Sequence, residues 1–370
     1  MKLSLSSADL LSQLQIVSRV ASTRSAVQAL SGVLISAADG AATQLLATDM
    51  EVGLRVPIEA DVQRPGSAVL PARLLLDVAR SLPARQLTME LRAAEQDVEL
   101  ICGATTFHLR VLRAEDFPTL PSPAPDTRVT LPAEAFVQTV ARVARSASRD
   151  ETRPVLTGIL VSASERELRM VATDSYRLTV KETTLEAPLS SGFEVNVPAR
   201  ALQELARLVS HDGDEQLEIR VRQNQVLFTL GRAVLSSRLI DGQFPNFRQL
   251  LPDSFEHELR IAGGELTDAV RRISLLAQRN APLRLAFAAG EVTVSAQTPD
   301  VGEARESLPV AFQGEPLEIG FNAEFLRAGL EAVDEGDIVL RLISPLRPGL
   351  IEAADGSRFR YLIMPIRLNV

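Results

Sequence analysis

Apolar residues recur at helical spacing in six segments of the chain. In residues 6–22 they include Leu10 and Leu14, and Ser6 or Ser7 stands before them as a candidate N-cap. Recurrence every three or four residues predicts an amphipathic helix with one buried face. The other segments with this spacing are residues 73–80, 132–148, 200–208, 264–280 and 323–332.

The stretches between these segments alternate apolar and polar residues. "VELICGATTFHLRVL" (98–112) and "QLEIRVRQNQVLFTL" (216–230) are two examples. A period of two predicts antiparallel strands with one face toward a core. Each third of the chain therefore reads helix, strands, helix, strands, and the predicted class is α+β.

The chain contains a threefold internal repeat. The tripeptide ATD occurs at 47–49 and 172–174, PAR at 71–73 and 198–200, and Phe-Pro at 117–118 and 244–245. A more diverged third copy covers 283–308, 317–333 and 361–366, and it lacks ATD. Each repeat is long enough to bury its own core.

Three domains of similar length are predicted from these repeats. Proline-rich segments at 118–128 and 245–259 are the expected linkers. The expected domains are residues 1–120, 128–246 and 257–370.

Positive charge is concentrated in the predicted helices. The chain carries a net charge of −8, and all of its 39 basic residues except Lys2 and Lys181 are arginines. The six predicted helices together are nonetheless net positive, which leaves the strands and loops strongly acidic. If the helices share one surface, that surface favours a polyanion. The alternative is that these arginines are ordinary solvated surface.

Several classes of protein are disfavoured by the residues present. The single cysteine, Cys102, excludes an internal disulfide and is expected to be a small buried hydrophobe. The histidines His108, His211 and His257 lie far apart, so we expect structural roles and neither a metal site nor a cofactor. No lysine follows a glycine-rich turn, as a P-loop would require. No leader or membrane span is recognised, and a cytoplasmic location is expected.

Four motifs in the same order and at the same spacing connect the chain to a known family. "VATDSYRL", "DGQFPNFRQLLP", "EIGFN" and "YLIMPIRL" together resemble the bacterial DNA polymerase sliding clamp, the beta subunit of the replicative polymerase. The resemblance spans essentially the whole chain. It implies three clamp domains, each with two helices packed on antiparallel sheets. It also implies a head-to-tail homodimer closed into a six-domain ring, with the helices around duplex DNA.

The resemblance further implies a non-catalytic processivity factor with several partners. These are double-stranded DNA bound without sequence preference, and the polymerase catalytic subunit, clamp loader and repair polymerases, which bind through short linear motifs. Such partner peptides enter one apolar pocket. On this chain its residues are Leu156, Thr173, Ser175, Tyr176, Arg177, Leu178, Pro245, Leu250, Asn322, Phe325, Leu362, Met364, Pro365, Ile366, Arg367 and Leu368. The alternative is a last strand that merely completes the core.

Two further surfaces follow from the resemblance. The closing contact pairs Phe107 and Leu109 with Leu275 and Leu276 of a second copy, although all four could instead be core. The expected DNA-facing residues are Arg24, Arg73, Arg80, Arg142, Arg145, Arg149, Arg153, Arg200 and Arg207.

The chain departs from the family pattern in places. Asn369 and Val370 extend beyond the usual last leucine, and Gln249 replaces a basic residue that often stands at the pocket rim. Pro154 and Val155 replace aromatic residues that touch DNA in some relatives, so Arg149 and Arg153 are expected to carry that contact. We expect a peptide pocket only at the second repeat.

Two alternative interpretations remain open from the sequence. The chain could be a clamp-like paralogue that binds a small-molecule inhibitor or serves repair. Asp49 and Asp174 could also be a catalytic carboxylate pair, but their equivalent places in two repeats favour a repeated turn.

Overall fold

The structure is a computed structural model. It describes residues 1–38, 42–121, 128–189, 191–209, 215–277, 281–299, 301–333 and 336–368. The chain divides into two compact units. The first comprises 1–134 and 204–239, and the second comprises 135–203 and 240–370. The middle repeat therefore contributes to both units.

The first unit contains two antiparallel sheets and the helices α1 (Ser7–Val17) and α2 (Ala72–Ser81). The smaller sheet has the order β5 (Asp61–Arg64), β1 (Lys2–Ser6), β7 (Gln86–Arg92), β8 (Asp97–Cys102), β9 (Thr105–Arg110). The larger sheet has the order β10 (Arg128–Pro132), β15 (Gln216–Val221), β16 (Gln225–Leu230), β17 (Ala233–Arg238), β4 (Val52–Pro57), β3 (Gln44–Thr48), β2 (Gly32–Ala37), β6 (Gly66–Pro71). The short 3₁₀ helices are η1 (Gln28–Ser31) and η2 (Ala114–Asp116).

The second unit repeats this plan with the helices α5 (Gly263–Ser274) and α6 (Ala323–Leu330). Its larger sheet has the order β14 (Phe193–Pro198), β11 (Gly158–Ser164), β12 (Glu167–Thr173), β13 (Arg177–Thr184), β25 (Phe359–Ile363), β24 (Gly349–Ala353), β23 (Asp337–Leu342), β18 (His257–Ala262). Its smaller sheet has the order β21 (Gly302–Pro309), β20 (Glu291–Thr298), β19 (Pro282–Ala288), β22 (Leu317–Asn322). The 3₁₀ helices are η3 (Ala144–Ser146), η4 (Pro154–Thr157) and η5 (Phe247–Leu250).

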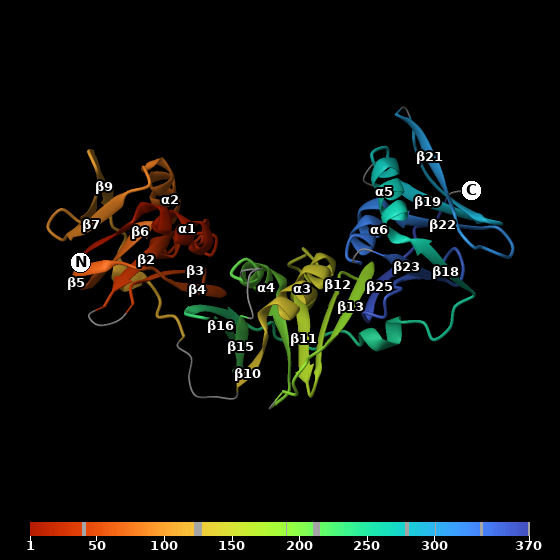
Figure 1. The fold of residues 1–370 in the computed structure, drawn as a ribbon, viewed down its shortest axis with the longest axis horizontal. Helices are drawn as coiled ribbons and strands as arrows, with labels where there is room; N and C mark the ends of the chain where they lie inside the picture. Colours follow the sequence, from red (N-terminus) through yellow and green to blue (C-terminus); the bar gives the residue numbers. More distant parts are fainter. Residues whose placement is uncertain are drawn as a thin grey trace. The chain divides into compact units, whose positions relative to one another are not determined.

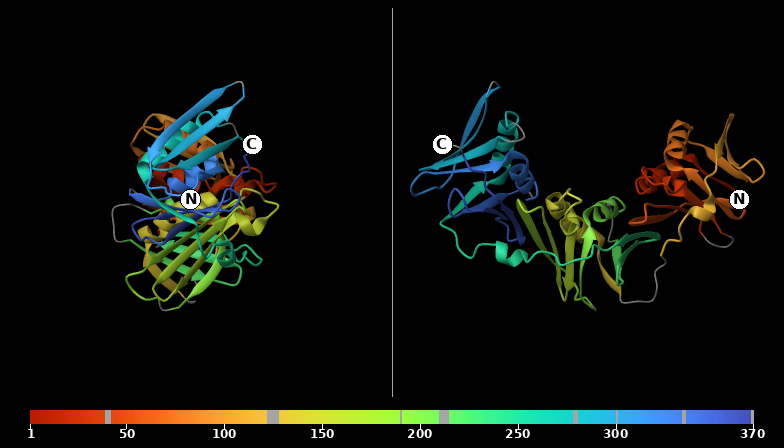
Figure 2. Two further views of the ribbon diagram at one scale, coloured as in Figure 1. Left: turned by 90° about the vertical axis from the view of Figure 1, so that its right-hand side faces the viewer. Right: turned by 180° about the vertical axis from the view of Figure 1, so that it is seen from behind.

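Two more helices, α3 (Ala133–Val143) and α4 (Ala199–Ala206), fall at the boundary between the units. The described residues thus contain six α-helices, two in each repeat, and the predicted α+β class is confirmed. In Figures 1 and 2, α1 lies beside α2 and α5 lies beside α6.

Each eight-stranded sheet joins strands from two consecutive repeats. In the first unit β17 pairs antiparallel with β4, and in the second unit β25 pairs antiparallel with β13. The order β10-β15-β16-β17 in the second repeat is matched by β1-β7-β8-β9 in the first and β18-β23-β24-β25 in the third. Strand β9 therefore corresponds to β17 and β25, but it ends its sheet.

Strand β21 is the complementary edge at the other end of the chain. The order β22-β19-β20-β21 in the third repeat corresponds to β6-β2-β3-β4 in the first and β14-β11-β12-β13 in the second. Strands β4 and β13 are covered by the next repeat, whereas β21 ends its sheet. Within the described residues, one strand of each kind is thus left as an edge.

The helices form where the apolar spacing predicts them, but all except α2 end earlier than predicted. In α1 the residues Leu10, Leu14 and Val17 are buried, and the Ser6 hydroxyl accepts a hydrogen bond from the Asp9 amide at 3.3 Å, which confirms Ser6 as the N-cap. The predicted helix runs to residue 22, whereas α1 ends at Val17.

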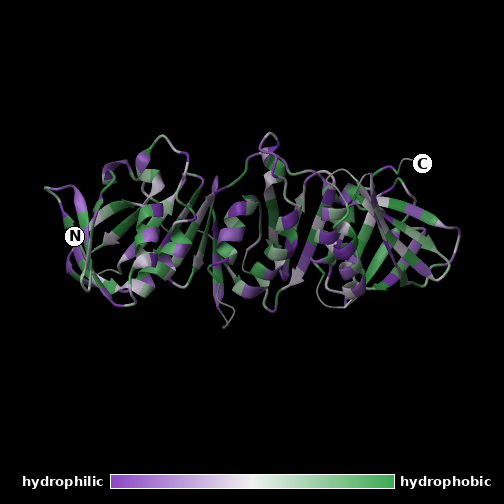
Figure 3. Ribbon diagram, turned by 90° about the horizontal axis from the view of Figure 1, so that it is seen from above, coloured by the Kyte–Doolittle hydropathy of each residue, from purple (hydrophilic) through white to green (hydrophobic). Residues whose placement is uncertain are grey.

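The cores follow the alternation seen in the sequence. Figure 3 shows hydrophobic and hydrophilic positions interleaved along the strands and helices. In the third repeat Tyr361, Phe321 and Phe287 are buried in one cluster with aliphatic residues of β18 to β25. Cys102 is 1% exposed, so its prediction as a buried small hydrophobe is confirmed. None of the helices described is long and apolar enough to cross a membrane.

Candidate functional site

The second ATD sequence forms a tight turn between β12 and β13. The Asp174 Oδ1 atom accepts hydrogen bonds from the amides of Tyr176 (2.9 Å) and Arg177 (3.0 Å), and its Oδ2 atom pairs with Arg177 Nε at 2.9 Å. The Thr173 hydroxyl donates to the Arg177 carbonyl at 2.7 Å, and Ser175 adopts a φ of 80°. Asp174 is committed to this turn, so the predicted repeated turn is confirmed for the second copy.

The C-terminal segment runs along this turn. Strand β25 pairs with β13, and beyond the ladder the Met364 amide donates to the Tyr176 carbonyl at 2.8 Å. Farther on, the Ile366 amide donates to the Gly320 carbonyl of β22, also at 2.8 Å. A Cβ on Gly320 would lie 2.7 Å from Leu368 Cδ2, so the absence of a side chain at Gly320 lets Leu368 lie against β22. Residues 364–368 are therefore held between two sheets.

An apolar floor lies beneath the turn. Leu178 and Leu362 face each other across β13 and β25 and are buried with Phe247 of η5. Above this floor the rim is open, because Tyr176 is 61% exposed, Leu250 49% and Met364 42%. Large exposed apolar side chains around a buried floor are typical of a site that a partner covers.

Phe325 joins helix α6 to the same rim. The Phe325 ring centroid lies 6.5 Å from the Tyr176 ring centroid, and the Arg177 guanidinium lies 4.3 Å from the Phe325 centroid. The Asn322 side chain accepts the Phe325 amide at 3.0 Å as the N-cap of α6. The buried Tyr361 hydroxyl donates to the Phe325 carbonyl at 2.7 Å, and burial raises the pKa of Tyr361 to about 12. The Tyr176 and Phe325 rings and the Arg177 guanidinium are thus held in place by contacts from the turn before β13, from α6 and from β25.

The remaining pocket candidates fall into two groups. Leu156 and Thr173 are buried, and Thr173 serves the turn. The others are exposed or half-buried on the linker and the C-terminal segment: Pro245, Pro365, Ile366, Arg367 and Leu368. Asn369 and Val370, which extend the chain at this end, lie outside the described residues.

Sequence reasoning missed one residue at this turn. Arg153 was expected to face DNA, but its Nη1 atom donates to the Ser175 hydroxyl at 3.0 Å and its Nε pairs with Asp150 at 3.0 Å. The local signal was the spacing of Asp150 and Arg153, which lets the pair form within the loop.

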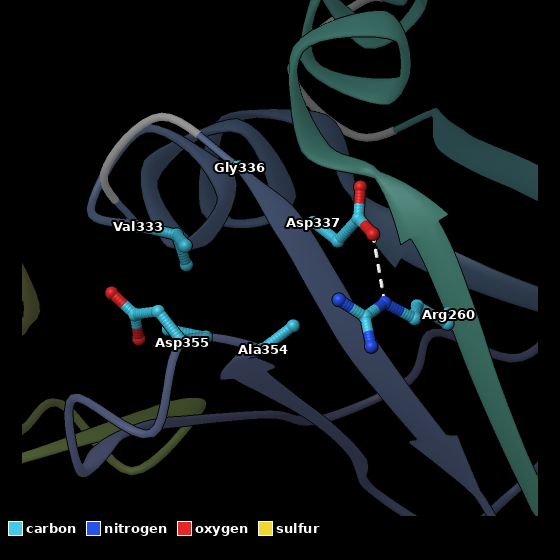
Figure 4. A pocket seen from close by; sticks show the side chains of 7 residues that line it. Arg260, Val333, Gly336, Asp337, Ala354 and Asp355 are labelled. Carbon is cyan, nitrogen blue, oxygen red and sulfur yellow. Dashed lines mark hydrogen bonds and ion pairs between the residues drawn. The ribbon is translucent and has the colours of Figure 1, made fainter.

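A second hollow in this unit, of about 370 Å³, is drawn in Figure 4. It lies at the ends of β24 and β23, and the Arg260 Nε donates to Asp337 Oδ2 at 2.7 Å on its wall. Asp355 stands on another side, and hydrogen bonds from Ser357 hold the pKa of its carboxyl below the usual value. The charged groups that line this hollow are largely compensated by neighbouring residues. The hollow lies at the opposite end of β24 from Gly349, which pairs with Ile363 beside the turn.

Comparison with known proteins matches all three repeats to one family. The family profiles for the N-terminal, central and C-terminal domains of the DNA polymerase III beta subunit match residues 1–121, 130–246 and 248–367. The chain belongs to the beta sliding clamp family.

Individual relatives agree with this assignment. The beta sliding clamp of Synechococcus elongatus is 33% identical over 375 residues, and the match covers 100% of both chains. The sliding clamp of Bacillus subtilis superposes with a TM-score of 0.92 at 27% identity, with full coverage of both chains. A clamp of Pseudomonas aeruginosa bound to griselimycin gives a TM-score of 0.90 at 29% identity, again with full coverage.

Several of the arginines expected to face DNA in this clamp are engaged in ion pairs. Arg145 Nη1 lies 2.6 Å from Glu331 Oε2, Arg207 Nη1 lies 2.6 Å from Glu204 Oε1, and Arg80 pairs with Asp77 at 3.5 Å. Arg142 is half-buried, and burial lowers its pKa. The others, which are exposed, are Arg24, Arg73, Arg149 and Arg200.

The residues expected at the closing contact differ in exposure. Leu275 follows α5 and is 85% exposed, whereas Leu276 is half-buried and its carbonyl accepts the Thr298 hydroxyl at 2.5 Å. On β9, Phe107 is half-buried and Leu109 is 5% exposed. Leu275 is therefore the largest apolar surface among the four.

Proposed function

We propose that this sliding clamp works as a head-to-tail dimer that closes into a ring around duplex DNA. The observation that carries the proposal is the repeated strand pairing. The chain joins its repeats through β17 with β4 and β25 with β13, and it leaves one edge of each kind, β9 and β21. Pairing β9 of one copy with β21 of the next would continue both sheets and remove the exposed edges.

The exposed Leu275 supports the same contact. It stands two residues after the buried Ile273 of α5, as Arg145 stands two residues after the buried Val143 of α3, and Arg145 pairs with Glu331 of the following repeat. Leu275 presents an exposed apolar side chain where Arg145 presents a charged one, and an exposed apolar side chain suits burial against another copy. Phe107 and Leu109 on the facing strand β9 and Leu276 complete the proposed contact.

Inside the ring, the helices are proposed to hold DNA through diffuse charge. A clamp must bind DNA without holding one position, so it requires phosphate contacts and no base contacts. Exposed arginines such as Arg73, Arg149 and Arg200 suit this task because a guanidinium pairs readily with phosphate. We propose domain boundaries at 1–120, 128–246 and 257–370, which give each domain two of the six helices.

The pocket at Tyr176, Leu250 and Met364 is proposed to receive short peptides of the polymerase, the clamp loader and repair polymerases. Support comes from the exposed apolar rim over a buried floor and from the adaptability of a methionine side chain. We propose no catalytic role, because the second-repeat aspartate is committed to its turn, and we propose a cytoplasmic location with the chromosome.

The decisive experiment measures retention on DNA by topology. Clamp loaded by its clamp loader should remain on a closed circular plasmid during gel filtration at high salt, and linearising the plasmid should release it. Ordinary electrostatic binding would be lost from both forms alike because it weakens with salt. Equal retention on circular and linear DNA would overturn the proposal.

A further inference from the structure

The first ATD sequence forms the same turn as the second. The Asp49 Oδ1 atom accepts the amides of Glu51 (3.0 Å) and Val52 (2.8 Å), as Asp174 does for its own turn. The Thr48 hydroxyl donates to the Val52 carbonyl at 2.8 Å, and Met50 adopts a φ of 78°, against 80° for Ser175.

The strand beside the turn is also the same. Strand β17 pairs with β4 as β25 pairs with β13, and the Arg238 amide donates to the Glu51 carbonyl at 2.8 Å. Met364 and Tyr176 make the corresponding bond at 2.8 Å in the second copy. Arg238 and Glu51 therefore stand where Met364 and Tyr176 form the rim of the peptide pocket.

A hollow of about 130 Å³ lies over this first turn, within the first unit. Its floor is smaller and more polar, because Gly53 and Ser236 face each other where the second copy has Leu178 and Leu362. A Cβ on Gly53 would lie 2.7 Å from Ser236 Oγ and 2.8 Å from Leu120 Cδ2, so Leu120 of the linker closes the bottom. The remaining space suits one aliphatic side chain rather than a large aromatic one.

Opposite charges flank the hollow without local partners. Glu51 and Arg238 both line it, both are exposed, and neither makes an ion pair with any residue that the structure describes. A ligand that brings one basic and one acidic group would complement both. The backbones of Arg238 and Glu51 lie side by side, joined by the hydrogen bond from the Arg238 amide to the Glu51 carbonyl, so a short extended chain can reach both side chains.

The two exposed methionines of the chain lie at the two ATD turns. The chain has five methionines. Met1, Met89 and Met170 are buried, whereas Met50 is 51% and Met364 is 42% exposed. Met50 lines the hollow of the first turn, and Met364 stands at the rim of the second. Methionine is suited to surfaces that accept varied side chains.

We propose that the first-repeat hollow is a second peptide-binding site, specific for a short extended peptide with an aliphatic side chain between a basic and an acidic residue. The aliphatic side chain lies against Met50 and Leu120, the carboxylate meets Arg238, and the ammonium meets Glu51. The inference rests on the proposed peptide pocket of the second repeat for its binding mode, but its ligand chemistry is different.

The two exposed methionines allow both sites to be followed at once. The full-length clamp, labelled with ¹³C at the methionine methyl groups, is titrated with the blocked tripeptide Ac-Lys-Leu-Asp-NH₂ in the millimolar range. The Met50 resonance should shift and saturate while the Met364 resonance stays in place. An unmoved Met50 resonance, or one that moves only in parallel with Met364, would overturn the proposal.

Specificity is tested with paired changes in probe and protein. Replacing Asp by Asn in the probe should weaken binding about threefold to fivefold, as expected for a partly exposed ion pair. Arg238→Gln should weaken binding of Ac-Lys-Leu-Asp-NH₂ by the same factor and abolish the preference for the Asp probe over the Asn probe. Glu51→Gln should likewise weaken binding of Ac-Lys-Leu-Asp-NH₂, because its lysine then loses its counter-charge. Arg232→Gln, at the other end of β17 where Arg232 pairs with Glu59, is the matched control and should change nothing. Equal effects of Arg238→Gln and Arg232→Gln would contradict the site.

A second titration separates this inference from the proposed function. A peptide from the polymerase should shift Met364 and leave Met50 unchanged. If Met364 fails to respond, the peptide pocket of the second repeat is wrong, whatever Met50 does. If the Met364 resonance shifts with the polymerase peptide and the Met50 resonance does not shift with the charged tripeptide, only the proposed site in the first-repeat hollow is wrong.

Discussion

The Arg145 guanidinium lies 2.6 Å from the Glu331 carboxylate, a contact between the second and third repeats inside one compact unit. Arg271 of α5 pairs with the same carboxylate at 3.1 Å. At the junction of the first two repeats, Arg19 pairs with Glu204 at 3.1 Å. Arg19 and Arg145 each stand two residues beyond the first helix of their repeat. Both junctions thus use a carboxylate to hold arginines that could otherwise bind phosphate.

Removing the Glu331 charge should therefore strengthen DNA binding. In Glu331→Gln, Arg145 and Arg271 lose their main counter-charge, and binding of a labelled duplex should become tighter at low salt. The slope of log K against log[salt] should become more negative by about 1 to 2, one counterion for each arginine that gains a phosphate. Fluorescence anisotropy over a salt series measures both quantities.

The matched control for this variant is Glu318→Gln. Glu318 pairs with Arg284 at 3.2 Å, but the pair lies on strands β22 and β19 and on no helix. Its salt slope should equal that of the wild type. If Glu331→Gln and Glu318→Gln give the same slope, the helix junction is not part of the DNA surface.

The same carboxylate makes stability depend on pH. Burial of Glu331 opposes its charged form, but hydrogen bonds from Arg145 and Arg271 outweigh burial, so its pKa lies below the ordinary value of 4.5. A lowered pKa stabilises the fold fully above pH 4.5, and this contribution is lost as the pH falls through the folded-state value. Because Glu331 is partly exposed, the contribution should be at most about 1 kcal/mol.

Urea unfolding of wild type and Glu331→Gln over a series from neutral to acid pH measures this contribution. The variant should have the lower midpoint at neutral pH, and the difference should shrink as the pH falls through the folded-state pKa of Glu331, because the wild-type carboxyl then becomes protonated. A difference that is constant or grows on acidification would show that the pair does not stabilise through its charge.

Helix number and place could be predicted from the sequence, but helix ends could not. The apolar spacing of 6–22 continues through Val20 and Ala21, and both are buried, yet α1 ends at Val17. The chain turns there, and the Ser22 amide donates to the Leu30 carbonyl at 2.7 Å. The apolar spacing of the sequence shows which residues are buried. It does not show whether they are buried in a helix or in a packed loop.

The candidate site shows the same division between local and distant signals. The ATD turn is encoded within five residues, so its role in both copies could be predicted, and the structure confirms it. The pairing of Arg145 with Glu331 spans 186 positions and depends on how two repeats join. Counting charges shows that the predicted helices are net positive, but it cannot show which of their arginines are held in ion pairs by carboxylates.

The proposed closing contact predicts a monomer from one surface change. Leu275 is 85% exposed in the chain, so Leu275→Asp should leave the fold intact while placing a charge in the dimer contact. Burying an unpaired carboxylate costs several kcal/mol, and sedimentation at micromolar concentration should show monomers. Leu250→Asp, at a comparably apolar exposed position on the pocket rim, should remain dimeric. A dimer that survives Leu275→Asp would move the contact elsewhere.

The peptide pocket predicts different costs for its rim and its floor. Met364→Ala should weaken a polymerase-derived peptide by about 1 to 3 kcal/mol with little change in stability, since Met364 is 42% exposed. Leu178→Ala should weaken the peptide similarly but also destabilise the fold by about 2 to 5 kcal/mol, because Leu178 is 2% exposed in the floor cluster. Isothermal titration and thermal unfolding separate the two effects. Met50→Ala removes the other exposed methionine, which lies at the first turn and is 51% exposed, and should leave this affinity unchanged. If Met364→Ala also leaves the affinity unchanged, the peptide binds elsewhere.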